Sequence, residues 1–183
     1  MSVSALTIMR WQQPLGLMTA LLLSLLALLP ARAGLGLDDA QLKAAFIYRF
    51  AQFTQWPGQA ATEFSYCVVG SPVLREAMAS LAQKPHLVSV VRVRSVSEPA
   101  QAQGCQVLVL GMSERSELLR WQQALGAEPV LIVGDSAEAF RAGVSIALMV
   151  EPNGLAFRIN HSEAKRRGLS LSSQMLKLAR EVK

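Results

Sequence analysis

Cys67 and Cys105 are the residues of this chain best suited to covalent chemistry. They form no Cys-x-x-Cys pair, which disfavours a thioredoxin-like redox activity. An even cysteine count favours a structural disulfide over metal ligation in an exported chain, and the N-terminus described below predicts export. Cys67 falls within one predicted strand and Cys105 directly before another, and these two strands are neighbours in a flavodoxin-like sheet. The sequence therefore predicts a Cys67–Cys105 disulfide; the alternative is two buried free thiols that pack as small apolar groups.

The remaining reactive residue types form no recognisable catalytic or metal-binding pattern. His86 and His161 are the only histidines, and neither has a partner at zinc-ligand spacing. The segment around Ser113 lacks the Gly-x-Ser-x-Gly elbow of a hydrolase, and no Gly-x-Gly-x-x-Gly motif indicates a dinucleotide cofactor. We therefore expect no catalytic residue, no metal and no cofactor. An uncharacterised hydrolase is the least supported function.

Polar side chains follow three predicted strands at their carboxyl ends, in the turns Gly70-Ser71, Gly111-Met112-Ser113 and Gly134-Asp135-Ser136. The carboxyl edge of a parallel sheet is where α/β proteins usually bind ligands, and helix N-termini with nearby hydroxyls can hold an anion. Candidate ligand residues are therefore Ser71, Ser113, Asp135 and Ser136. The alternative is that they form ordinary β-to-α turns and helix N-caps, which use the same residue types.

A dense group of aromatic residues lies early in the chain: Phe46, Tyr48, Phe50, Phe53 and Trp56. Core packing is their default role, since Phe46, Phe50 and Phe53 share one face of a helix. Tyr48 points away from that face, so part of the segment is a candidate exposed interface. The residues predicted to meet a partner are Tyr48, Phe53 and Trp56.

Alternating strands and helices must position these residues. Apolar runs predict strands over 64–69, 87–93, 107–110, 130–133, 144–150 and 155–159. Helical spacing predicts helices over 38–56, with Leu42 and Ala45 on the apolar face, over 73–83, after an N-cap at Ser113, and up to about residue 140. Two further helices end the chain, with Ser162 or 170–173 as caps and Met175, Leu176 and Leu178 buried. The predicted fold is an α/β layered sandwich: a largely parallel sheet flanked by helices, with an antiparallel β-hairpin near the C-terminus.

Residues 1–33 have the pattern of a cleaved secretory signal peptide. A positive charge at Arg10 precedes an apolar stretch over 15–29, and Ala31-Arg32-Ala33 provides a small-x-small cleavage site. The apolar stretch is shorter than the roughly 20 residues that span a bilayer, although an uncleaved membrane anchor is the alternative. The sequence thus predicts a periplasmic protein whose residues 34–183 form a single domain.

Loss of Arg10 and Arg32 with the signal peptide lowers the net charge from +5 to +3. Much of the remaining excess lies near the C-terminus, in Lys165-Arg166-Arg167 and in Lys177, Arg180 and Lys183. No aromatic residues are interleaved with these side chains, which disfavours nucleic acid as a partner. A solvated helical face is the predicted role of the cluster; the alternative is contact with anionic lipid or an acidic partner.

Six segments resemble the YfiR family in sequence and in order. They are 43–57 (KAAFIYRFAQFTQWP), 66–70 (YCVVG), 104–111 (GCQVLVLG), 129–135 (PVLIVGD), 153–160 (NGLAFRIN) and 168–179 (GLSLSSQMLKLA). The resemblance implies a periplasmic regulator that is not an enzyme. It also matches Cys67 and Cys105 to a pair that forms a disulfide in the family, whereas the family's second, C-terminal pair is absent here.

The named member of that family represses an inner-membrane diguanylate cyclase by binding its periplasmic sensory domain, and an outer-membrane lipoprotein can sequester the repressor. We therefore expect this chain to act as a homodimeric periplasmic repressor that lowers cyclic di-GMP signalling and biofilm formation. The alternative is a periplasmic small-ligand-binding protein that uses the strand-end loops.

Overall fold

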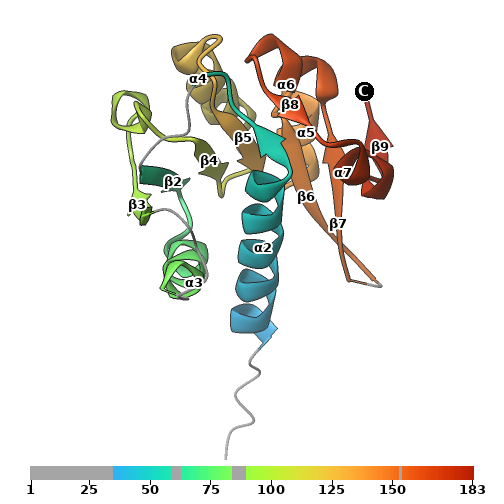
Figure 1. Cartoon of the computed structure of the whole chain (residues 1–183). Helices are drawn as coiled ribbons and strands as arrows, with labels where there is room; N and C mark the ends of the chain where they lie inside the picture. Colours follow the sequence, from blue (N-terminus) through green and yellow to red (C-terminus); the bar gives the residue numbers. More distant parts are fainter. Residues whose placement is uncertain (1–34, 59–62, 84–89, 153) are drawn as a thin grey trace, which may run out of the picture. The chain divides into compact units, whose positions relative to one another are not determined.

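The computed structural model describes residues 35–58, 63–83, 90–152 and 154–183 (Figure 1). The predicted signal peptide lies outside these residues, and the chain from Leu35 onward forms one compact unit. The helices are α2 (Leu35–Gln52), α3 (Pro72–Ala82), the 3-10 helix η1 (Pro99–Ala102), α4 (Arg115–Leu125), α5 (Ala137–Ala142), α6 (His161–Arg166) and α7 (Ser173–Leu178). The strands are β1 (Thr54–Gln55), β2 (Glu63–Val69), β3 (Val90–Ser95), β4 (Val107–Leu110), β5 (Leu131–Gly134), β6 (Ile146–Glu151), β7 (Gly154–Ile159), β8 (Ser170–Leu171) and β9 (Glu181–Val182). None of the described helices has the length and apolarity needed to cross a membrane.

Seven strands form the central sheet, in the order β3-β2-β4-β5-β6-β7-β9. The first five are parallel, β7 returns antiparallel to β6 as a hairpin, and β9 pairs parallel with β7. This arrangement confirms the predicted fold class. The strand predicted over 87–93 is observed as β3, with 87–89 outside the described residues. The sequence did not predict β9 or the antiparallel pair β1–β8, because two-residue strands carry no periodicity.

Apolar residues of the parallel strands alternate between two buried layers, as expected for a sheet covered on both faces. On β2 and β4, Tyr66 and Val107 point into the layer beneath α2 and α3, whereas Cys67 and Leu108 point into the layer beneath α4 and α5. The second layer also contains Trp121 of α4, which is fully buried. Figure 1 shows α2 crossing one face of the sheet, with α3 beside it.

The buried face of α2 is rotated from the predicted one. The helix buries Ala40, Ala44, Ile47, Tyr48, Phe50 and Ala51, whereas Leu42 is 45% exposed and Ala45 is also exposed. The helix approaches α3 closely along this face, and the bulky Phe46 and Phe53 lie at its margin, half-buried. The helix also ends at Gln52 rather than near 56, because Thr54 leaves it to pair with β8.

Two helix N-caps lie one or two residues from their predicted positions. The N-cap of α4 is Glu114 rather than Ser113, and that of α6 is Asn160 rather than Ser162. Ser172, which lies within the predicted range, caps α7.

Two expectations for the C-terminal segment are wrong. The side chain of Arg167 is 0% exposed: its Nε donates to Glu163 Oε1 at 2.7 Å and its Nη1 to Glu128 O at 3.2 Å. The basic cluster is therefore not a uniformly solvated face. Leu178, predicted to be buried, is 73% exposed, because α7 packs through Met175 instead.

Candidate functional site

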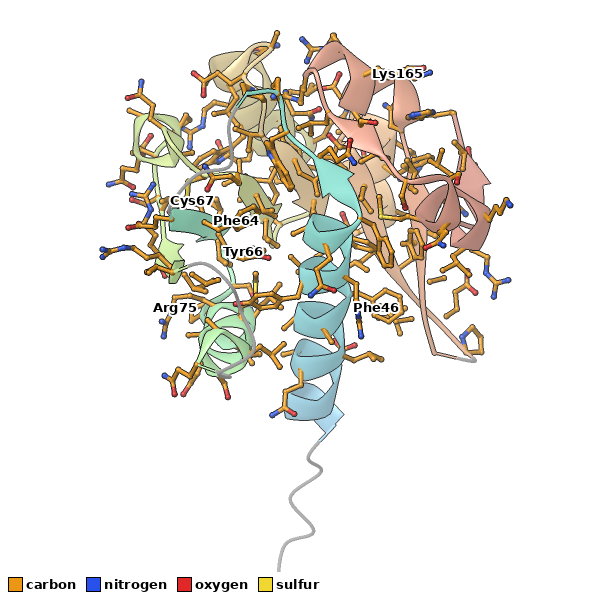
Figure 2. All side chains as sticks on the ribbon, viewed as in Figure 1. Phe46, Phe64, Tyr66, Cys67, Arg75 and Lys165 are labelled. Carbon is orange, nitrogen blue, oxygen red and sulfur yellow. A yellow bond between two sulfur atoms is a disulfide. The ribbon has the colours of Figure 1, made fainter. Side chains whose placement is uncertain are left out.

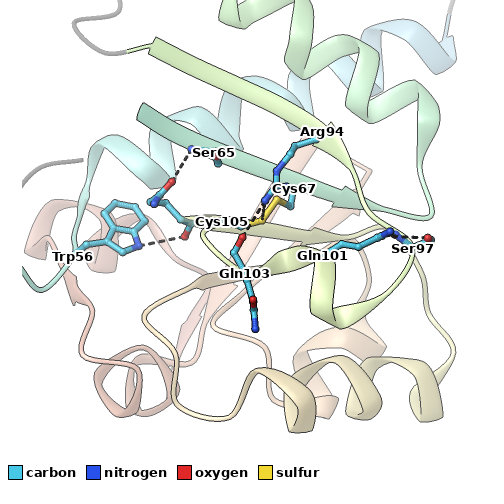
Figure 3. Close-up of a disulfide and its surroundings, with 9 residues drawn as sticks. Trp56, Ser65, Cys67, Arg94, Ser97, Gln101, Gln103 and Cys105 are labelled. Atoms are coloured by element: carbon cyan, nitrogen blue, oxygen red, sulfur yellow. Dashed lines mark hydrogen bonds between the residues drawn. A yellow bond between two sulfur atoms is a disulfide. The ribbon is translucent and has the colours of Figure 1, made fainter. Parts of the chain in front are cut away.

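The predicted disulfide joins Cys67 in β2 to Cys105, two residues before β4 (Figure 3). The two Cα atoms are 6.0 Å apart, and both residues are buried. Because β2 and β4 are neighbouring strands, the bond closes across one strand pair of the sheet. The pairing is confirmed, and the alternative of two free thiols is wrong.

Arg94 of β3 lies directly against this disulfide (Figure 3). Its Nη2 donates to Gln103 O at 3.1 Å and lies 3.3 Å from Cys105 Sγ. The side chain of Arg94 thus connects β3 to the segment that carries Cys105.

The segment after α2 is anchored next to the disulfide through Trp56. The indole Nε1 donates to Gln106 O at 3.2 Å, and Gln106 Oε1 accepts from Ser65 N at 2.6 Å. The ring of Trp56 packs edge-on against Phe64, with centroids 5.1 Å apart. Trp56 is thus held in one orientation while remaining partly exposed.

A surface hollow of about 570 Å³ opens beside Trp56. Its walls come from Ala51 and 54–58 after α2, from Phe64 and 104–106 around the disulfide, and from 128–130 before β5. Gln55, Gln106 and Glu128 supply polar side chains in an otherwise mainly apolar lining. The volume lies within the range of small-molecule pockets, and such a hollow also accommodates a protruding side chain of a protein partner. The sequence indicated only Trp56, because the three wall segments are distant along the chain.

Tyr48, one of the three predicted interface residues, is not available to a partner. It is 8% exposed, its hydroxyl donates to Met78 O at 3.0 Å, and its ring lies 4.6 Å from that of Tyr66. Burial raises the pKa of Tyr48 to about 12. The prediction of an exposed Tyr48 is wrong because the rotated helix turns this residue toward α3, which leaves Phe53 and Trp56 as the partly exposed members of the set.

The three strand-end turns lie along the carboxyl edge of β2, β4 and β5. The first two approach closely, since a Cβ on Gly111 would lie 2.7 Å from Ser71 Cβ. The Oγ of Ser71 accepts from Leu74 N at 3.4 Å. In the same way, Ser136 Oγ accepts from Ala139 N at 3.1 Å and caps α5.

The other two candidate ligand residues differ from each other in their surroundings. Asp135 accepts from Lys43 Nζ at 3.1 Å, whereas Ser113 is exposed and precedes the N-cap of α4. Three of the four candidate side chains therefore already have partners within the protein. Their use in ligand binding stays a prediction, and it would require exchange of these partners.

Lys43 connects α2 to the carboxyl edge of the sheet through two carboxylates. Its Nζ lies 2.8 Å from Asp39 Oδ2 and 3.0 Å from Asp135 Oδ1. Burial opposes the charge of Lys43, but the hydrogen bonds to both aspartates raise its pKa overall. Burial also raises the pKa of Asp135, although Lys43 opposes this shift. The ion pair with Asp135 fixes α2 to the carboxyl edge of the sheet, and the two aspartates already neutralise the charge of Lys43.

A second hollow, of about 350 Å³, runs between α2, β7 and α7 and is almost entirely apolar. We call it the α2–α7 groove; it is lined by Leu42, Ala45, Phe46, Arg49, Phe50, Phe53, Phe157, Met175 and Leu178. Figure 2 shows Phe46 on the flank of α2 nearest β7. The sequence signal for the groove was present in the spacing of Leu42, Ala45, Phe46 and Phe53, which sequence analysis assigned to the core. Within the described ranges, His, Cys, Asp and Glu form no cluster of three or more suited to a metal ion.

Comparison with known proteins gives one family match and two structural likenesses. The sequence pattern of the family described as YfiR/HmsC-like matches residues 40–180. No curated protein sequence matches the chain. The crystal structure of the ABC domain in complex with L-Trp from Streptococcus pneumoniae is similar with a TM-score of 0.56 at 9% identity, over 79% of this chain and 60% of that one. A conserved domain protein from Vibrio cholerae O1 biovar El Tor is similar with a TM-score of 0.54 at 13% identity, over the same shares, 79% and 60%. The chain thus spans less than two thirds of either protein, and at these identities the likeness shows the fold alone.

Proposed function

This chain belongs to the YfiR/HmsC-like family of periplasmic regulators of cyclic di-GMP signalling, and we propose that it represses an inner-membrane diguanylate cyclase by binding the cyclase's periplasmic sensory domain. The observation that carries the proposal is the family match over residues 40–180, nearly the whole described domain. Members of this family are regulators rather than enzymes. The buried disulfide fits the periplasm, because such bonds persist in oxidising compartments.

The proposed mechanism is a shift in the population of two states of the cyclase. A periplasmic protein has no access to a cytoplasmic second messenger, so its effect passes through the outward part of a membrane protein. If the repressor binds the inactive state more tightly, its binding lowers cyclic di-GMP synthesis. Sequestration by an outer-membrane lipoprotein would reverse the effect, and a homodimer would present the binding surface twice.

A small-ligand-binding function is the second candidate, and one observation favours it. The hollow beside Trp56 has the volume of a ligand pocket, and polar residues, among them Gln106 and Glu128, contribute to its lining. On this second proposal, the ligand would bind in the hollow rather than at the strand-end loops. A screen of small periplasmic metabolites by thermal shift tests it: a ligand at 100 times its dissociation constant stabilises by about 2.7 kcal/mol.

Deletion of the gene tests the repressor proposal. We expect cyclic di-GMP and biofilm to rise in the deletion strain, and to stay at the parental level when the target cyclase is deleted as well. Exported protein should restore repression, whereas the same protein without residues 1–33, retained in the cytoplasm, should not. Unchanged cyclic di-GMP in the single deletion would contradict the proposal.

A further inference from the structure

The α2–α7 groove combines a rigid aromatic floor with exposed apolar rims. Phe50 and Phe157 form the floor, with ring centroids 4.9 Å apart, and Phe46 lies 6.1 Å from each of them. On the rims, Leu42 of α2 is 45% exposed and Leu178 of α7 is 73% exposed. The floor is thus fixed by packing, while the rims leave apolar surface in water.

The shape of the groove fits a helix better than an extended peptide. Its α2 wall runs from Leu42 to Phe53, which at 1.5 Å per residue is about 16 Å, or three helical turns. One wall is the helix α2, and the other comes from the short helix α7 and from Phe157 of β7. The strand β7 is paired with β6 on one side, and Phe157 O accepts from Arg180 N on the other, so this wall offers no free backbone ladder to an added strand. An occupant must therefore bind through side chains, as an amphipathic helix does when it places residues i, i+3, i+4 and i+7 in an apolar groove.

The charges around the groove indicate which sign of charge the occupant should carry. Arg49 lines the groove, and its Nη1 donates to the neutral Gln52 Oε1 at 3.0 Å. Lys177 precedes Leu178 on the rim and is exposed. Among the described residues, the ion pairs within 4.0 Å include neither of these two cations. An acidic side chain of the occupant would complement Arg49, the cation that lines the groove, and such complementarity favours orientation and rate of association more than affinity.

We propose that the α2–α7 groove binds an amphipathic helix of the partner cyclase's periplasmic segment, which presents an apolar seam to the Phe floor and an acidic residue to Arg49. The inference rests on the proposed function and names the surface through which repression occurs. A concave groove suits a helix, whereas a membrane surface is better met by protruding apolar side chains.

Single substitutions on the exposed rims test the groove without disturbing the core. The variants are Leu42→Asp, Leu178→Asp and Arg49→Glu. Val73→Asp is the matched control, because Val73 is a 50% exposed apolar residue on α3, outside the groove. Arg49→Lys is the conservative control for charge. All five proteins should show thermal transitions close to that of the wild type, since none of the replaced side chains is buried.

The probe is the purified periplasmic domain of the cyclase whose activity rises in the deletion strain, titrated calorimetrically against the full mature protein. We expect each groove variant to bind at least about tenfold more weakly, and Val73→Asp and Arg49→Lys to bind within about twofold of the wild type. If the groove variants bind as tightly as the wild type, the groove is not the binding site, and the proposed function still stands. Failure of the wild type to bind would overturn both.

Two further measurements separate the other possible occupants. Sedimentation of the same variants should show an unchanged oligomeric state, and flotation with vesicles of anionic phospholipid should show no binding. If the substitutions dissociate a dimer and leave binding to the cyclase domain unchanged, the groove binds a second copy of the chain and the proposal is wrong. If they abolish binding to vesicles and leave binding to the cyclase domain unchanged, the groove binds a membrane surface and the proposal is also wrong.

Discussion

Removal of the disulfide is the perturbation whose effect the structure defines most directly. The bond closes a segment of 38 residues, for which the chain-entropy relation gives about 4 kcal/mol at 25 °C. Both cysteines are buried in the layer beneath α4 and α5, so the reduced thiols would remain packed as small apolar groups. We therefore expect the double variant Cys67→Ala/Cys105→Ala to lose about 4 kcal/mol of unfolding free energy, with a further small loss from the missing sulfur contacts.

Urea unfolding followed by fluorescence measures this loss, because Trp121 lies fully buried in the same layer. At about 2–4 °C per kcal/mol for a domain of this size, the melting temperature should fall by roughly 8–16 °C. Reductant should lower the stability of the wild type by a similar amount and leave the double variant unchanged, which makes the variant its own control. A loss below about 1 kcal/mol in both the variant and the reduced wild type would refute the reasoning, since the closed segment would then constrain the unfolded chain very little.

Three further predictions concern polar contacts. Ser136→Ala should cost about 1 kcal/mol of unfolding free energy through loss of the α5 cap, whereas Ser113→Ala, which removes no cap, should stay within about 0.5 kcal/mol. The pKa of Lys43 is raised in the folded state, so its ion pairs contribute fully to the unfolding free energy below about pH 10.5. This contribution is lost as the pH rises through the pKa of the folded state. Urea unfolding should show the alkaline loss of stability in the wild type and not in Lys43→Met. Glu163→Gln should cost about 3 kcal/mol because it leaves the buried guanidinium of Arg167 without a counter-ion, whereas Arg167→Met should stay within about 1 kcal/mol; equal costs in urea unfolding would contradict this asymmetry.

The sequence predicted the parallel sheet and its hairpin because the apolar runs of the strands are strong local signals. The Cys67–Cys105 pair was predictable for a different reason: strand order places the two segments side by side, and the chain offers no other cysteine. The rotation of α2 was not predictable from apolar spacing, because two sets of residues compete for the core. Spacing favours a face that includes Phe46 and Phe53, whereas packing of α2 beside α3 buries Tyr48 instead.

The burial of Arg167 could not be predicted from the sequence either. A run of basic residues usually indicates a solvated face, and Lys165 and Arg166 conform, since both are exposed. Arg167 follows the end of α6, where its side chain reaches Glu128 O in the loop before β5. Only the tertiary position of that loop distinguishes Arg167 from its neighbours, so no local pattern identifies it.

The arrangement of the domain separates the disulfide from the surface proposed to bind the partner. Cys67 and Cys105 lie in the layer beneath α4 and α5, whereas the α2–α7 groove draws on the opposite layer, which contains Phe50 and Phe157. The α2 wall is held at one end by Lys43 and beyond the other by the hydrogen bond of Trp56 to Gln106 O, the residue that follows Cys105. A groove wall anchored in this way is ordered before a partner arrives, which lowers the entropic cost of binding. Reduction of the disulfide would lower the stability of the whole domain, so repression would decline with the folded fraction of the repressor.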